Sequence, residues 1–266
     1  MRAVPAAEAV SPTAADPAAT DVGLLRALWE LRQRTRCNDV SGCDAEDVVR
    51  GYGSAALDEL GILARQAGPR TPWLPRVLRL IGELGDDRVE PLLREMAASE
   101  EDAVRSSALL ALIRRGAVET ERLEREAGTR AAAATSRSRL TAAWALGRNG
   151  DVAAQTRFNA MLQELAGQIV AADSLRWGYW LCGLDQQPSC SAALVAGARH
   201  PGYLVRREVL RRIEARPTPA HRDALAILMH DPMLPLRRDA RAVVRAVAGS
   251  APETWAGLLA ELEKAQ

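Results

Sequence analysis

The chain is poor in lysine and in aromatic residues, and it has no long apolar run. Lys264 is the only lysine among 266 residues, and aromatic residues make up 4%. No stretch of about 18 consecutive apolar residues occurs, which excludes an ordinary membrane-spanning helix. The basic charge is almost wholly arginine, and the formal net charge is +1. This balance argues against a protein that coats nucleic acid or an anionic membrane with its whole surface.

Motifs of catalysis and of phosphate or metal binding are also missing. The chain has no G-x-x-x-x-G-K-[ST], G-x-S-x-G, H-E-x-x-H or G-x-G-x-x-G, and it has no C-x-x-C redox pair. Its three histidines, His200, His221 and His230, lack the spacing of metal ligands. We therefore expect a protein that is not an enzyme, with no catalytic residue, no metal and no cofactor.

The first 20 residues, MRAVPAAEAVSPTAADPAAT, are rich in Ala and Pro and have no hydrophobic centre. They are not an intact signal peptide. This composition predicts a disordered leader over 1–20, of the kind left after a signal peptide is removed. A periplasmic or secreted protein fits that interpretation, and a cytoplasmic protein with a disordered start is the alternative.

From residue 21 onward the apolar residues follow a helical period, and nothing alternates with a period of two. Pairs of apolar residues four positions apart recur about every 33 residues. These pairs are Leu80/Leu84, Ala108/Leu112, Ala142/Leu146, Trp177/Leu181, Val209/Ile213 and Val243/Val247. Shorter amphipathic segments lie between them. The repeating unit is therefore helix, turn, helix, and stacked units are needed to bury a shared core.

Two segments carry the repeat best: VRSSALLALIRRG (104–116) and SRLTAAWALGRNGD (138–151). Their pattern resembles HEAT repeats, in particular short bacterial HEAT-like repeats, over roughly residues 55–250. Arg105, Arg139 and Arg206 stand seven residues before the Leu or Ile of the repeat, where such repeats often place an arginine.

The resemblance implies an all-α fold, a right-handed α-solenoid of about six helix-turn-helix units. We expect it to span residues 21–266 as one domain. Helices at 21–36 and at the C-terminus would cap its two ends.

The four cysteines form two local pairs, Cys37/Cys43 and Cys182/Cys190, each across a turn. Their spacings fit zinc knuckles poorly. We expect two disulfides, Cys37–Cys43 and Cys182–Cys190, which would indicate an oxidising compartment. Buried or free thiols are the alternative, and Cys182 within WLCGL fits it well.

Charge is uneven along the chain. Residues 83–126 contain twelve acids against seven arginines, whereas residues 199–245 contain eleven arginines against five acids. One interpretation is solvated helix faces with ion pairs along each helix. The functional interpretation is a concave wall whose arginines bind carboxylates or phosphates of a partner. The arginines that we expect on this wall are Arg105, Arg139, Arg176, Arg206 and Arg237.

The densest aromatic segment is Arg176-Trp177-Gly178-Tyr179-Trp180. Trp177 holds a core position of the repeat. Tyr179 and Trp180 point in other directions, and an exposed aromatic beside arginine is typical of an interface. We therefore add Tyr179 and Trp180 to the predicted binding residues, although a corner of helix packing would have the same composition.

These observations favour a non-catalytic scaffold that binds an acidic protein partner through its concave face. Nucleic acid is a less favoured partner at this net charge. The alternative is an enzyme built on similar repeats, either of the HEAT-like bilin lyase type or of the HEAT-like alkylpurine DNA glycosylase type. No catalytic residue of either group matches a position of this sequence.

Overall fold

The computed structural model describes residues 22–33, 43–68, 70–128, 136–168, 171–185 and 190–264. Within these ranges all regular structure is helical, which confirms the all-α prediction. The leader predicted over 1–20 lies outside the described residues.

The helices of the N-terminal half are short and closely spaced. They are α1 (Val22–Leu31), α2 (Asp44–Tyr52), α3 (Leu57–Gln66), α4 (Leu74–Leu84), α5 (Glu90–Met96), α6 (Asp102–Arg114) and α7 (Thr120–Gly128).

The C-terminal half continues with helices of more varied length. They are α8 (Arg137–Arg148), α9 (Val152–Ala166), α10 (Ala172–Asp185), α11 (Ser191–Ala198), α12 (Tyr203–Ala215), α13 (Arg222–Leu228), α14 (Leu234–Ser250) and α15 (Pro252–Lys264). The 3₁₀ turn η5 (Pro219–His221) precedes α13.

Local sequence signals explain where several helices begin and end. Asp151 caps α9 by accepting a hydrogen bond from the backbone N–H of Ala154 at 3.0 Å. Prolines stand in the first turn of α4, α5 and α14, where no hydrogen-bonding N–H is needed. The turns after α6 and α8 contain Gly116 and Gly150 at φ of 69° and 98°, a backbone region that favours glycine.

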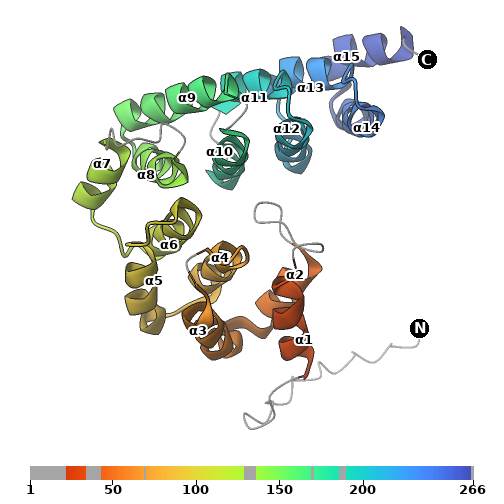
Figure 1. The fold of residues 1–266 in the computed structure, drawn as a ribbon. Helices are drawn as coiled ribbons and strands as arrows, with labels where there is room; N and C mark the ends of the chain where they lie inside the picture. Colours follow the sequence, from red (N-terminus) through yellow and green to blue (C-terminus); the bar gives the residue numbers. More distant parts are fainter. Residues whose placement is uncertain are drawn as a thin grey trace, which may run out of the picture.

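The helices lie in two rows that follow an arc (Figure 1). The inner row contains α4, α6, α8, α10, α12 and α14, and each of these helices packs on the next. In the outer row α9, α11, α13 and α15 pack on one another in the same order. The helices α1 and α15 lie on the two arms at the open side of the arc (Figure 1).

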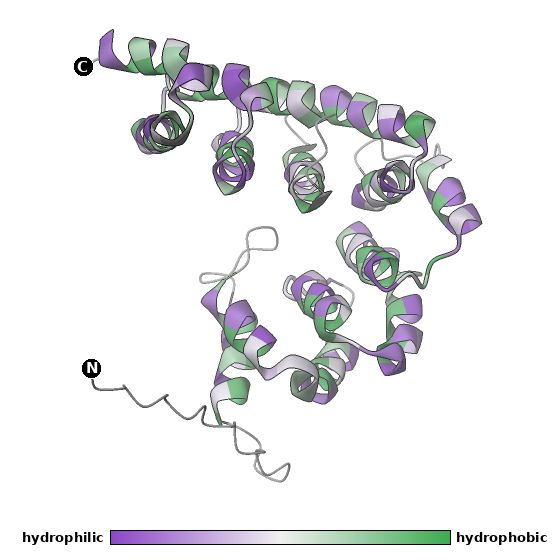
Figure 2. Cartoon of the chain, turned by 180° about the vertical axis from the view of Figure 1, so that it is seen from behind, coloured by the Kyte–Doolittle hydropathy of each residue, from purple (hydrophilic) through white to green (hydrophobic). Residues whose placement is uncertain are grey.

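The core lies between the two rows. The apolar pairs of the repeat fall on the inner helices and are buried, apart from the partly buried Leu84. Figure 2 shows hydrophilic and hydrophobic residues on every helix of both rows, as expected of amphipathic helices that bury one face. The inner helices differ in how much of their other face is free: α4, α6 and α8 are buried almost all round, whereas α12 and α14 keep one face exposed.

Candidate partner-binding face

Arg206, predicted to bind a partner, is buried. Its Nε lies 2.6 Å from Asp231 Oδ2, and its Nη1 donates to the carbonyls of His200 and Pro201 at 2.9 and 2.8 Å. The side chain thus joins the turn before α12 to the turn before α14. This corrects the expectation that Arg206 faces a partner: its donors are already used in packing between neighbouring helix pairs.

Arg105 and Arg237 occupy the same kind of position. Arg105 donates to the carbonyls of Ser99 and Glu100 at 2.9 and 3.1 Å, and Arg237 donates to the carbonyl of Asp231 at 2.6 Å. In both cases the guanidinium binds the turn that precedes its own helix, as Arg206 does. Both arginines belong to the predicted wall, and Arg105 also carried the resemblance. Each holds a turn in place and is only partly exposed.

Asp102 continues this network into the next helix pair. Its carboxylate accepts hydrogen bonds from the backbone N–H groups of Arg137 and Ser138 at 2.5 and 3.2 Å, at the start of α8. Negative charge at a helix N-terminus is favourable. Arg105 pairs with the same carboxylate at 2.9 Å. The predicted Arg139 lies beside this junction, partly buried.

In the pairs 206–207 and 237–238, the second arginine points the other way. Arg207 and Arg238 are exposed, whereas Arg206 beside Arg207 is buried. Arg211 follows Arg207 by four residues on α12, and Arg245 follows Arg238 by seven on α14, so each couple shares one helix face. That face is opposite the buried side, which packs on the outer row and on the neighbouring inner helix. Because the outer row lies on the convex side of the arc (Figure 1), the face belongs to the inside of the arc.

The predicted Arg176 on α10 joins this set. Its side chain is 11% exposed and pairs with Asp173 at 3.3 Å. We call Arg176, Arg207, Arg211, Arg238 and Arg245 the inner arginine face. It spans three consecutive inner helices.

Like charges lie close together on this face. Burial lowers the pKa of Arg211, and the positive charges of Arg207, Arg212 and Arg176 lower it further, although Glu208 opposes them. Glu208 is itself engaged by Arg212 at 2.8 Å. A further carboxylate placed near Arg211 would relieve this repulsion.

Trp180 lies at the tight bend of the arc. The guanidinium groups of Arg79 on α4 and Arg114 on α6 stand 5.4 and 5.8 Å from the centre of its ring. Trp177 is 4.9 Å from Trp180 between ring centres, and its Nε1 donates to Thr141 Oγ1 at 2.9 Å. Trp180 stays partly exposed, so this predicted residue lies on the inside of the arc beside Arg176.

Tyr179 does not reach the surface. It is fully buried, and its hydroxyl donates to the carbonyl of Ala193 on α11 at 2.9 Å. Burial raises the pKa of this hydroxyl well above its ordinary range. The expectation that Tyr179 contacts a partner is therefore corrected: it ties α10 to the outer row.

The second cysteine pair is oxidised as predicted. Cys182 and Cys190 form a disulfide with their Cα atoms 6.1 Å apart, which joins the end of α10 to the start of α11. Cys37 lies outside the described residues, so the Cys37–Cys43 disulfide stays a prediction.

The described ranges show no group of three or more His, Cys, Asp or Glu side chains that could hold a metal ion. None of their helices combines the length and the apolar character needed to cross a membrane.

Comparison with protein-family models, with curated proteins and with solved structures found no match to this chain.

Sequence reasoning missed Arg207, Arg211, Arg238 and Arg245. The signal was present, because Val205, Val209 and Ile213 fix the buried side of α12 and positions 207 and 211 lie opposite it.

Proposed function

We propose that the chain is a HEAT-like α-solenoid that acts as a non-catalytic scaffold and binds an acidic protein segment on the inside of its arc. The observation that carries this proposal is the inner arginine face, where arginines of α10, α12 and α14 face the same space. Guanidinium forks bind carboxylates with two parallel hydrogen bonds.

The acids on this face favour a peptide over a nucleic acid. Asp173 and Asp239 pair with Arg176 and Arg238 at 3.3 and 3.5 Å, and Glu214 shares the face of Arg207 and Arg211. Such interspersed charges would repel a uniform phosphate backbone. A peptide can place its carboxylates selectively, and Trp180 offers an aromatic contact at the end of the face.

The arginines that hold the turns support the proposal indirectly. Because Arg105, Arg206 and Arg237 bind the turns before their own helices, the spacing between inner helices is held by buried or partly buried bonds. A rigid face loses little conformational freedom on binding.

The test uses a fluorescein-labelled peptide in which glutamates alternate with serines, and it measures the anisotropy of the label at low salt. The variant Arg207→Glu/Arg211→Glu should weaken binding by at least about tenfold. The control Arg157→Glu/Arg199→Glu makes the same charge change on exposed residues of the outer row and should bind as the unaltered chain does.

A labelled DNA duplex is titrated in parallel. Tighter binding of the duplex than of the peptide, lost in the same variant, would replace the proposed partner by nucleic acid. Absence of peptide binding, or an equal loss in both variants, would reject the inner arginine face as the site.

A further inference from the structure

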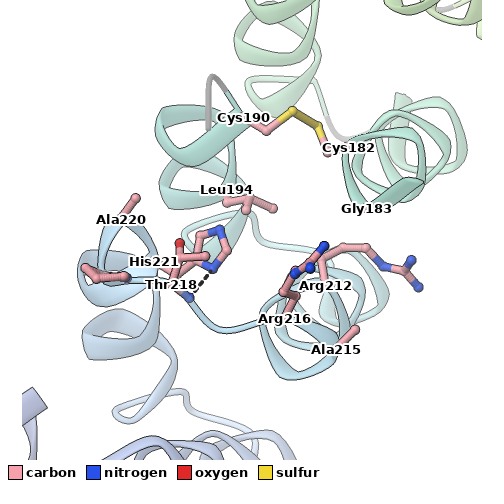
Figure 3. Close-up of a pocket in the computed structure, with 11 residues that line it drawn as sticks. Cys182, Gly183, Cys190, Leu194, Arg212, Ala215, Arg216, Thr218, Ala220 and His221 are labelled. Carbon is pink, nitrogen blue, oxygen red and sulfur yellow. Dashed lines mark hydrogen bonds between the residues drawn. A yellow bond between two sulfur atoms is a disulfide. The ribbon is translucent and has the colours of Figure 1, made fainter. Parts of the chain in front are cut away.

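A cavity separate from the inner arginine face lies between the rows, near the disulfide. Its volume is about 370 Å³, and it is bounded by the ends of α10 and α12, by α11 and by η5 (Figure 3). Small-molecule sites commonly begin at about 300 Å³. None of its lining residues belongs to the inner arginine face.

Most of the cavity wall is apolar. The apolar lining consists of Cys182, Gly183, Cys190, Leu194, Ala215, Pro219 and Ala220. The disulfide forms part of this wall and fixes α10 against α11. Figure 3 shows the disulfide and Leu194 on one side of the space and Arg216 on the other. The wall suits the apolar body of a ligand.

The cavity has few polar groups, and some of them already have an ion-pair or hydrogen-bond partner within the protein. The charge of Arg212 is offset by Glu208 at 2.8 Å. Burial lowers the pKa of His221, whose Nδ1 accepts a hydrogen bond from the backbone N–H of Thr218 at 3.3 Å. The neutral ring therefore carries its proton on Nε2.

Arg216 differs from these groups. It is exposed at the end of α12, and no carboxylate of the described residues pairs with its guanidinium. It is thus a full positive charge at the edge of an apolar space, next to a neutral imidazole. A ligand with an apolar body and an anionic head would gain twice here. Its body would be removed from water, and its head would form charge-assisted hydrogen bonds with the guanidinium.

We infer that this cavity binds a small monocarboxylate with an apolar body, whose carboxylate pairs with the Arg216 guanidinium and whose body packs on the disulfide, Leu194 and Ala215. The inference is independent of the proposed scaffold function, because the two sites share no residue.

The test is calorimetric titration of the oxidised chain with octanoate, and with octan-1-ol and octylammonium as neutral and cationic probes of equal length. Octanoate should bind at least about tenfold more tightly than either. Arg216→Met keeps the aliphatic stem and removes the charge, and it should erase this preference. Arg199→Met, which removes an exposed arginine outside the cavity, should leave it unchanged.

A second variant tests the apolar wall. Ala220 lines the cavity and is exposed, so Ala220→Trp should fill the space without disturbing the core and should abolish octanoate binding. Circular dichroism checks that each variant is folded. The inference is overturned if octanoate does not bind the unaltered chain or binds it no better than octan-1-ol does. It is also overturned if the Arg216→Met variant or the Ala220→Trp variant binds octanoate as the unaltered chain does.

Discussion

Arg206 Nε lies 2.6 Å from Asp231 Oδ2, and both side chains are buried between α12 and the turn before α14. The neighbouring Arg207 is exposed and faces the inside of the arc. Two adjacent arginines thus have separate roles, one in packing between helix pairs and one on the free surface.

The first prediction separates these roles. Arg206→Ala leaves the buried Asp231 carboxylate without its cation and should lower the free energy of unfolding by about 3–5 kcal/mol. Arg207→Ala removes only an exposed side chain and should change it by less than about 0.5 kcal/mol. Urea denaturation followed by circular dichroism measures both. Equal effects of the two substitutions would contradict the assignment.

The second prediction concerns pH. Burial alone would raise the pKa of Glu83, but hydrogen bonds from Arg114 and Arg50, both at 2.8 Å, hold that pKa below its ordinary value. The ionised carboxylate therefore stabilises the fold above the ordinary glutamate pKa of about 4.3. This contribution is lost as the pH falls through the lowered pKa of the folded state.

Glu83→Gln should accordingly lower the free energy of unfolding by about 1–2 kcal/mol at neutral pH. The difference from the unaltered chain should shrink below about pH 4, because protonation then removes the same charge from the unaltered chain. Denaturation series at neutral and acidic pH measure this difference. A difference that stays constant across that range would show that the ion pairs of Glu83 contribute no stability.

The third prediction concerns the disulfide. Trypsin cleaves after Arg176 and Arg199, so one peptide holds both Cys182 and Cys190. From unreduced protein that peptide should resist alkylation and should be lighter by two hydrogens than its reduced form. The peptide 37–50 reports separately on the predicted Cys37–Cys43 pair. Replacing Cys182 and Cys190 by Ala should lower the free energy of unfolding by about 2–3 kcal/mol, and labelling of both thiols without reduction would contradict the disulfide.

The fourth prediction concerns the contact of α4 with α6. A Cβ atom on Gly82 would lie 2.6 Å from Ala111 Cα, so Gly82→Ala must push two helix backbones apart. We expect a loss of about 1–3 kcal/mol in the free energy of unfolding. Gly61 on α3 is the matched control, since the nearest atom would be 3.7 Å away. Gly61→Ala should be neutral or stabilising by up to about 1 kcal/mol. Thermal denaturation distinguishes the two, and similar effects would count against close packing at Gly82.

The sequence was sufficient to predict the inner helices and their core pairs. A helix that buries one face places its apolar residues three or four positions apart, and this spacing is visible in the sequence. Ala142/Leu146 and Val209/Ile213 are buried as that period requires. The Cys182–Cys190 pair could also be predicted, since its partners are close in sequence and border one turn.

The candidate face was predicted only in part. Arg176 and Trp180 lie on it, but Arg206 was chosen in place of Arg207 because it occupies the arginine position of the repeat, which here serves packing. The stacking of Arg79 on Trp180 depends on the curvature of the arc, and the cavity depends on how α10 and α12 end. Neither follows from a local pattern of residues.

The contact between Arg79 and Trp180 joins positions about 100 residues apart, whereas a plain row of repeats has contacts only between adjacent units. Forming it closes a large loop of chain, and this closure carries an entropic cost that local packing does not. The bend of the arc should therefore be completed late in folding, after the units on either side are in place. Such long-range closure lengthens the folding time relative to an open row of the same size.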